Sequence, residues 1–260
     1  MLPRSGGTVV ARCLGSMKNV FLLSEVHPRT DPGLTQLDPI WQAQEWFRFF
    51  PDRPDAHKAF GGDAFAKKIE RVYDEVAARN GILVLRDWSH LDFTGFPHVK
   101  DPLGRLSILD ALDGRFDILN AALVRHPLPQ FASHRALMAS GSAERAAFVD
   151  KWFTPEFFAR AYLFYAQAAS DIGCVRYEDF LSDPDGFMKG LCATLAIPFD
   201  PGFQDRWRDN DSVTGAVDER TDRIAATPRA PLPPDLEARL RESLDYRKTC
   251  ALLDYDALSG

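Results

Sequence analysis

Short apolar runs alternate along the chain with longer segments of helical periodicity. Four runs have the length and composition of buried parallel strands: Asn19–Leu23, Gly81–Leu85, Asp117–Val124 and Ile172–Arg176. Several of the longer segments open with proline or a small polar cap. They predict helices over Thr8–Ser16, Ala64–Arg79, Leu128–Ser140, Ala143–Trp152, Pro155–Ser170, Pro184–Leu195 and Pro234–Tyr246. This alternation predicts an α/β fold, a parallel β-sheet flanked by helices.

No internal repeat or low-complexity stretch divides the sequence, so we expect a single domain over residues 1–260. Ligands of open α/β sheets bind at the carboxyl ends of the strands, and the loops there are where chemistry is expected. The segment 209–234 mixes charges, glycine and threonine with four prolines and shows no sustained periodicity. It is typical of a long surface loop, either one that covers a ligand or one that moves freely.

The composition and charge of the chain argue against several classes of function. The 45% of hydrophobic residues suffices for a substantial core, and the net charge of −6 argues against the broad basic face of a nucleic-acid-binding protein. No apolar run approaches the roughly 20 residues that span a bilayer, and no signal peptide is evident, so we expect no membrane span and a cytoplasmic protein. The four cysteines lack the spacing of zinc ligands, and no metal is expected.

The sequence PRSGGT, residues 3–8, stands directly before the first predicted helix. The backbone N–H groups of such a loop and the helix N-terminus can converge on an anion, and Arg4 adds a positive charge. The loop lacks the GK[ST] ending of a Walker A motif, which disfavours an ATP or GTP hydrolase. A glycine pair before a helix also fits a plain tight turn.

PRSGGT resembles the 5′-phosphosulfate loop of the sulfotransferase family, which usually reads PKSGTT or PRSGTT. The resemblance implies a P-loop nucleoside-triphosphate-hydrolase-like architecture and 3′-phosphoadenosine 5′-phosphosulfate (PAPS) as co-substrate. It implies that Arg4 approaches the bridging and 5′-phosphate oxygens, within a cradle supplied by Ser5, Gly6, Gly7 and Thr8. Gly7 replaces the usual threonine, which removes one hydroxyl contact and keeps the backbone donors.

Two later segments extend the resemblance. A strand-like run ends at Arg125, a proline follows, and Ser133 lies eight residues after the arginine. By resemblance, Arg125 pairs with the nucleotide 3′-phosphate as a planar donor fork, and Ser133 adds a hydroxyl bond. The segment from Val175 to Phe180 resembles the family's strand-to-YED element, which places Tyr177 near the adenine.

The loop 209–234 falls where many sulfotransferases cover the nucleotide. Gly215, Arg220 and Arg223 are its candidate contacts to the 3′-phosphate, although the loop lacks the RKG pattern of the cytosolic members. Solvated surface charge is the alternative interpretation. Before the first loop stand only Met1 and Leu2, where the family has a full strand, so the sequence leaves open a truncated chain, a start farther upstream or a very short strand.

Two residues compete for the role of general base. His90 follows the apolar run Gly81–Leu85 in a place that resembles the base of the cytosolic sulfotransferases, and an imidazole pKa near 6.5 suits proton transfer at neutral pH. Glu25 resembles the base of tyrosylprotein and related bacterial sulfotransferases. We favour His90, keep Glu25 as the competitor, and leave Asp87 or the absence of a protein base as the remaining alternatives. We expect Arg86 to form an ion pair with Asp87 that orients this loop.

The function predicted is therefore transfer of a sulfuryl group to the hydroxyl or amine of a small-molecule, glycan or peptide acceptor. One alternative is a P-loop nucleotide or small-molecule kinase, which would carry a lysine in the loop and carboxylates for magnesium. The other is a degenerate, non-catalytic nucleotide-binding domain. The sequence identifies neither the acceptor nor the oligomeric state.

Overall fold

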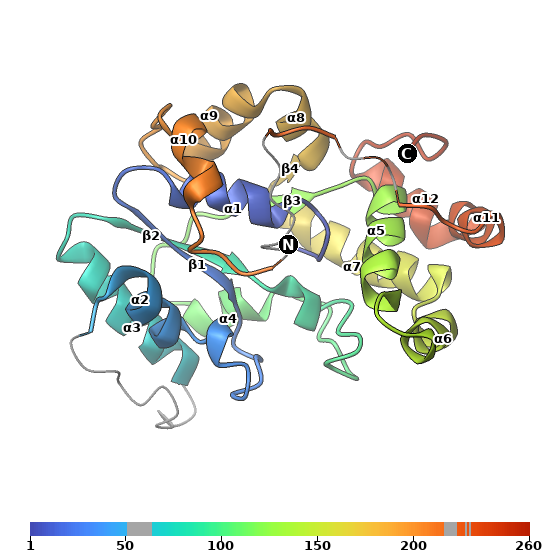
Figure 1. The fold of residues 1–260 in the computed structure, drawn as a ribbon, viewed down its shortest axis with the longest axis horizontal. Coiled ribbons are helices and arrows are strands. Elements are labelled where there is room, and N and C mark those ends of the chain that lie inside the picture. Colours follow the sequence, from blue (N-terminus) through green and yellow to red (C-terminus); the bar gives the residue numbers. More distant parts are fainter. Residues whose placement is uncertain (51–63, 216–222, 227, 229) are drawn as a thin grey trace.

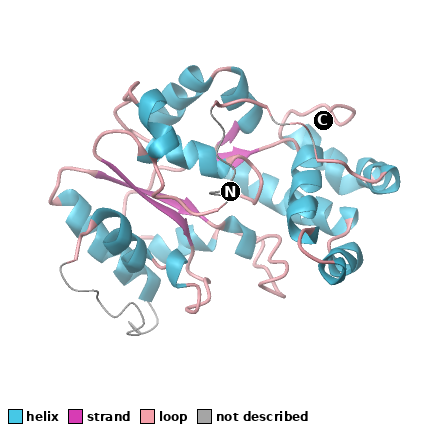
Figure 2. Cartoon of the chain, in the orientation of Figure 1, coloured by secondary structure: helices cyan, strands magenta, loops and turns pink. Residues whose placement is uncertain are grey.

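The computed structural model describes residues 1–50, 64–215, 223–226, 228 and 230–260. Its four strands form two parallel pairs (Figures 1 and 2). In the first pair β1 (Val20–Val26) lies beside β2 (Ile82–Asp87), and in the second β3 (Ala122–Val124) lies beside β4 (Cys174–Arg176). The prediction of an α/β fold with parallel strands is confirmed, while the strands of the described residues are split between two pairs.

Helices surround both pairs. In chain order they are α1 (Gly7–Gly15), α2 (Pro39–Phe47), α3 (Ala64–Ala77), α4 (Ser107–Leu112), α5 (Pro127–Ala139), α6 (Ala143–Trp152), α7 (Pro155–Ile172), α8 (Tyr177–Ser182), α9 (Pro184–Thr194), α10 (Phe203–Arg206), α11 (Pro234–Glu242) and α12 (Leu244–Leu252). Short 3₁₀ helices cover Thr35–Leu37, Ser89–Leu91 and Trp207–Asp209. None of the helices in the described ranges is long and apolar enough to cross a membrane.

Local sequence signals explain most helix starts. Proline occupies the first turn of α5, α7, α9 and α11, where its missing N–H costs nothing. The side chains of Thr154 and Asp183 cap α7 and α9 by accepting backbone N–H bonds. The helix predicted over Pro234–Tyr246 is wrong in one respect: it divides at Ser243, whose extended backbone ends α11 and whose side chain caps α12.

Three apolar clusters form the core. One gathers aromatic side chains of α5 and α7 against α12, with Phe131, Phe158 and Tyr162 fully buried. A second joins α1, α9 and the region around Trp207, and a third packs α2 and α3 against β1. The helices α2, α3 and α4 therefore lie at one end of the molecule, and α5, α6, α7, α11 and α12 lie at the other (Figure 1). The PRSGGT loop runs between them.

The strand predicted over Asp117–Val124 is correct only in its last three residues. Residues 117–121 have no ladder partner in the described part of the chain, and β3 pairs with β4 alone. A cavity of about 470 Å³ lies between β2 and β3. Strand formation depends on pairing, so an apolar run beside a cavity stays unpaired.

Candidate functional site

The PRSGGT loop has a backbone that few other sequences would allow. Arg4 has a φ of 62° and Gly6 a φ of 85°, both in the left-handed region. A Cβ atom on Gly6 would lie 2.1 Å from the Cε2 atom of Tyr177, so the ring of Tyr177 packs directly on the loop backbone. No side chain caps the N-terminus of α1, whose first N–H groups are therefore open to an anion.

Arg4, Ser133 and Arg125 meet at this loop. The Arg4 Nε donates to Ser133 Oγ at 2.9 Å, and Arg125 Nη1 donates to the Arg4 carbonyl oxygen at 2.9 Å. The Arg125 guanidinium lies over the Tyr177 ring, 5.3 Å from its centre. Four residues that the sequence singled out from distant segments thus come together with Gly6, and two of them are guanidinium cations.

Hydrogen bonds to the backbone directly after β3 hold this arrangement in place. The Tyr162 hydroxyl, reaching from α7, donates to the Arg125 carbonyl oxygen at 2.5 Å, and the Arg125 N–H donates back to it at 3.2 Å. Glu178 accepts from the next backbone N–H, that of His126, at 2.9 Å. Burial lowers the pKa of Arg125, because it removes water from the charged guanidinium. An anion beside Arg125 would offset that cost.

Glu25 lies at a bulge where β1 and β2 shift register, and its φ is 56°. Non-glycine residues in the left-handed region are costly and concentrate at functional sites. The Glu25 carboxylate accepts from Arg86 Nη2 at 2.9 Å and from Thr214 Oγ1 at 2.7 Å. The expected ion pair between Arg86 and Asp87 is therefore wrong: the strand pleat turns the two side chains apart, and Arg86 pairs with Glu25.

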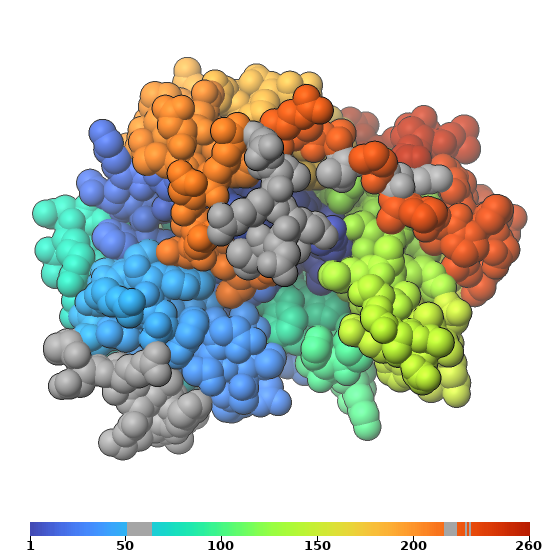
Figure 3. Space-filling view, viewed as in Figure 1, coloured from blue at the N-terminus to red at the C-terminus, as the bar shows by residue number. Residues whose placement is uncertain are grey.

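The described start of the loop 209–234 crosses this region. A Cβ atom on Gly215 would lie 2.7 Å from Thr8 Oγ1 and 3.7 Å from Glu25 Oε1, which puts Gly215 between the PRSGGT loop and the bulge. Figure 3 shows the orange and orange-red residues of the segment on the face turned to the viewer. Arg223 is exposed, and no hydrogen bond or ion pair within the described ranges involves it, while Arg220 lies outside those ranges.

His90 is buried and lies in the short 3₁₀ helix after β2. Its Nδ1 shares a hydrogen bond with Thr94 Oγ1, and its ring lies 5.6 Å from that of His134. Desolvation lowers the pKa of His90 to about 3, so this imidazole is a much weaker base than the free side chain. Burial lowers the pKa of His134, and the nearby charge of Arg4 adds to the effect.

Sequence reasoning missed Arg86 and Thr214 as site residues. The Arg86 Nε has no hydrogen-bond partner within the described residues and would lie 3.2 Å from a Cβ atom on Gly7. A signal for Arg86 existed, since it directly follows an apolar run at a strand end. No comparable signal marks Thr214, which belongs to the aperiodic segment. Among the residues that the structure describes, no three potential metal ligands are grouped to hold a metal ion.

Comparison with known proteins places the fold. No family model matches the sequence, and no curated protein matches it. A solved structure, the sulfotransferase domain from the curacin biosynthetic pathway, superposes with a TM-score of 0.63 at 16% sequence identity. The match covers 98% of this chain and 96% of that domain. The chain therefore has a sulfotransferase-like α/β fold along nearly its whole length.

Proposed function

We propose that the chain is a sulfotransferase that takes the sulfuryl group from PAPS and transfers it to an acceptor hydroxyl or amine. The observation that carries the proposal is the meeting of Arg4, Ser133, Arg125 and Tyr177 at the uncapped N-terminus of α1. The sulfotransferase-like fold supports it independently. In this proposal the PRSGGT loop binds an anion with its backbone N–H groups, as a P-loop does, but with Arg4 in place of the P-loop lysine.

In this proposal Arg4 and Arg125 each bind a different charged group of PAPS. Arg4 and the N–H groups at the start of α1 hold the 5′-phosphosulfate, and Thr8 adds a hydroxyl. Arg125 and Ser133 hold the 3′-phosphate, while the half-buried ring of Tyr177 contacts the adenine. The hydrogen bond from the Arg125 guanidinium to the Arg4 carbonyl oxygen links the 3′-phosphate site to the 5′-phosphosulfate site. Binding of one phosphate group therefore orients the residues that bind the other.

The acceptor oxygen or nitrogen attacks sulfur in line with the bridging oxygen. A new bond to sulfur forms, the bond from sulfur to the bridging oxygen breaks, and that oxygen leaves with the 5′-phosphate of adenosine 3′,5′-bisphosphate. The acceptor proton must go to a base. Arg4 neutralises the charge that develops on the leaving oxygen.

Glu25 is the base that the geometry favours. Its carboxylate is only partly buried, with 19% of the side chain exposed, and lies near Thr8 across Gly215. Arg86 and Thr214 each donate to one carboxylate oxygen and fix its direction. His90 in this structure is buried and has a pKa near 3, so we assign it to positioning of the loop through His134.

A transfer assay with two labelled donors tests the proposal. PAPS carrying labelled sulfur and ATP carrying a labelled γ-phosphate, with magnesium, are incubated with the chain and a mixture of phenol, sugar and amine acceptors. We expect label on an acceptor from PAPS and none from ATP. Label from ATP alone would instead identify a kinase, and binding of PAPS without transfer to any acceptor would identify a non-catalytic domain.

A further inference from the structure

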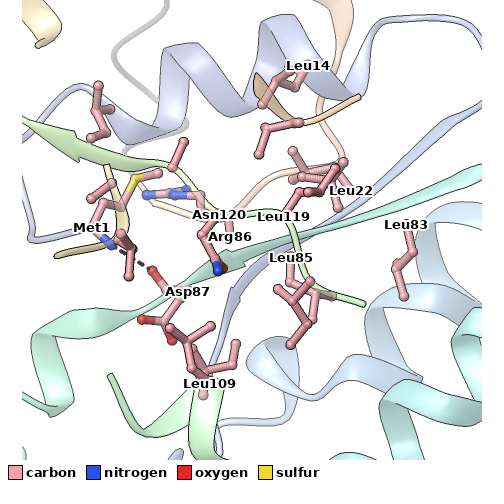
Figure 4. A pocket seen from close by; sticks show the side chains of 18 of the residues that line it. Met1, Leu14, Leu22, Leu83, Leu85, Arg86, Asp87, Leu109, Leu119 and Asn120 are labelled. Atoms are coloured by element: carbon pink, nitrogen blue, oxygen red, sulfur yellow. Dashed lines mark hydrogen bonds between the residues drawn. The ribbon is translucent and has the colours of Figure 1, made fainter. Parts of the chain in front are cut away.

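A groove runs along the outer edge of β4, the strand whose other edge pairs with β3. The groove has a volume of about 570 Å³ and lies between α9 and the end of α12 (Figure 1). It is distinct from the cavity between β2 and β3, which Figure 4 shows from close by. No residue of the PRSGGT loop is among the described residues that line the groove, so it is also distinct from the proposed nucleotide site.

The outer edge of β4 carries backbone groups without partners. The Ala122 N–H donates to the Gly173 carbonyl oxygen at 2.9 Å, and Ala122 is in register with Cys174. In a parallel ladder, successive residues of a strand direct their N–H and C=O groups to opposite edges, so Val175 bonds to β3 while Cys174 and Arg176 direct theirs toward the groove. Within the described ranges, the N–H groups of Cys174 and Arg176 donate to no other group. An unpaired edge of this kind can accept one more strand.

The groove has a wall on each face of such an added strand. Successive side chains of a strand point to opposite faces, so those of a strand beside β4 would alternate between α9 and the end of α12. The α9 wall includes Phe187, Leu191 and Gly190, and a Cβ atom on Gly190 would meet no atom within 4 Å. The opposite wall includes Leu252 and Leu253. Both walls therefore accept apolar side chains, and Gly190 leaves room for a large one.

The groove is acidic at the carboxyl end of β4. Arg176 Nε lies 3.5 Å from Asp179 Oδ2, and Arg176 Nη1 lies 3.8 Å from Asp254 Oδ2, so one guanidinium faces two carboxylates. The side chains of Asp179 and Asp254 are 57% and 102% exposed, which leaves both open to a ligand. No other charged side chain is among the described residues that line the groove. The excess of one negative charge favours a lysine or arginine in the occupant.

We infer that this groove binds an extended peptide segment of a partner protein, apolar at its centre and basic where it meets Asp179 and Asp254. The segment adds to the free edge of β4 as a further strand. Its main chain bonds to Cys174 and Arg176, which provides affinity, and its side chains contact both walls, which provides specificity. The inference goes beyond the proposed function and does not depend on it, because no nucleotide contact takes part.

Three synthetic peptides test the inference by fluorescence anisotropy. The first has four valine and leucine residues between two lysines, an acetylated and an amidated end, and a fluorescent label. The second and third have the same sequence and are N-methylated at alternate residues, one at the even and the other at the odd positions. Only one edge of an added strand faces β4, so one methylated peptide should bind as the first does, and the other should bind at least tenfold more weakly.

Two pairs of variants locate the binding. Gly190→Leu narrows the groove and should weaken binding of the first peptide at least tenfold, whereas Ala193→Leu, at an exposed position of α9 outside the groove, should leave it unchanged. Asp254→Asn keeps a residue type that tolerates a φ of 56° and should weaken binding about threefold. Asp113→Asn, at an exposed carboxylate after α4, is its control. Melting temperatures verify that all four variants fold.

Equal binding of the two N-methylated peptides would overturn the inference, and so would binding that Gly190→Leu leaves intact or an absence of binding by the first peptide. Sedimentation of the chain alone provides a further check. A dimer that Gly190→Leu dissociates would assign the free edge of β4 to a second copy of the chain and would also overturn the inference. No readout involves PAPS or adenosine 3′,5′-bisphosphate, so failure here leaves the proposed function standing.

Discussion

Single residues of the site are held in conformations or ionisation states that their surroundings impose. Glu25 keeps a left-handed backbone at a bulge, and Gly6 keeps one against the Tyr177 ring. His90 loses basicity through burial. These properties arise from contacts between distant segments, and each can be tested by one substitution.

Glu25→Gln is expected to lower kcat for sulfuryl transfer by about 10²- to 10⁴-fold, the usual contribution of a general base. Because the amide keeps the shape of the side chain, affinity for adenosine 3′,5′-bisphosphate should change less than threefold. His90→Gln should leave a pH profile of the wild-type shape, since the pKa of His90 is about 3. Steady-state kinetics from pH 5 to 9 provide the measurement.

Glu156→Gln is the matched control, because this exposed carboxylate pairs with Arg239 at the surface, away from the PRSGGT loop. It should leave kcat unchanged. A large loss of kcat in the His90 variant, together with normal activity of the Glu25 variant, would reverse our assignment of the base.

Gly6→Ala should destabilise the loop and abolish nucleotide binding. A Cβ atom in this left-handed position costs about 1–2 kcal/mol of backbone strain and also overlaps the Tyr177 ring. Gly104→Ala is the control, since Gly104 has a φ of 68° with no atom within 4 Å of a Cβ. Urea unfolding of both variants should give a larger loss of unfolding free energy for Gly6; equal losses would mean that Tyr177 does not pack on the loop.

The Met1 amine should make stability of the 260-residue chain depend on pH. Its pKa is about 6 in the folded chain and about 8 when unfolded, so between these values the unfolded chain binds more protons. The free energy of unfolding therefore rises with pH from 6 to 8, by about 2–3 kcal/mol in all, and the gain is lost as pH falls through 6.

An Nα-acetylated chain lacks the titrating amine and provides the comparison. Its unfolding free energy, measured by urea titration at each pH, should rise less over this window than that of the unmodified chain. Parallel pH dependences would show that the amine is solvated in the folded protein.

The residues of the candidate site lie at or directly after the carboxyl ends of the strands. Arg86 ends an apolar run in β2, Arg125 follows β3, and Tyr177 begins α8 directly after β4. The bulge at Glu25 adds β1 to this set. Parallel strands thus bring their functional residues to one side of the fold, as open α/β sheets generally do.

Gln42 of α2 supports the Glu25 bulge. Its side chain is fully buried, accepts from the Ser24 N–H at 2.8 Å and donates to the Ser24 carbonyl oxygen at 2.7 Å. Gln42→Leu leaves both backbone groups unpaired and should cost about 2–4 kcal/mol of unfolding free energy. Gln204→Leu is the control, at an exposed amide paired with Asp185, and should cost less than about 0.5 kcal/mol. Urea unfolding of both variants provides the measurement. Similar costs for the two would mean that Ser24 finds other partners.

Element prediction from the sequence succeeded where the signal was local. The starts of α7 and α9 are marked by a cap followed by proline, and the predicted start of each helix is confirmed. The strand over Asp117–Val124 was overextended, because periodicity cannot reveal that a strand has a neighbour on one edge only. The meeting of Arg4, Arg125, Ser133 and Tyr177 was anticipated, since each follows from a short motif.

Other features of the site could not be predicted from local sequence. The pairing of Glu25 with Arg86, the contact of Thr214 and the burial of His90 all depend on how segments far apart in the chain pack. A burial-driven pKa shift in particular has no local sequence signature, because the packing of distant segments decides whether a side chain loses its water. The roles of these residues remain predictions.

At the scale of the whole molecule, the loop 1–8 is the junction of two halves. It contacts the end of β2 on one side and Arg125 and Tyr177 on the other, and the apolar cavity lies behind it. Nucleotide binding would order this junction. We therefore expect the nucleotide to raise the melting temperature, and the increase should keep growing with the logarithm of the free nucleotide concentration above the Kd.

The most direct test of the account is calorimetric titration of the chain with adenosine 3′,5′-bisphosphate, compared with ATP and magnesium. We predict a micromolar Kd for the bisphosphate, weakened about 10- to 100-fold by Arg125→Ala and unchanged by the surface variant Arg239→Ala. ATP should bind far more weakly. Tight ATP binding, or bisphosphate binding that Arg125→Ala leaves intact, would contradict the proposed site.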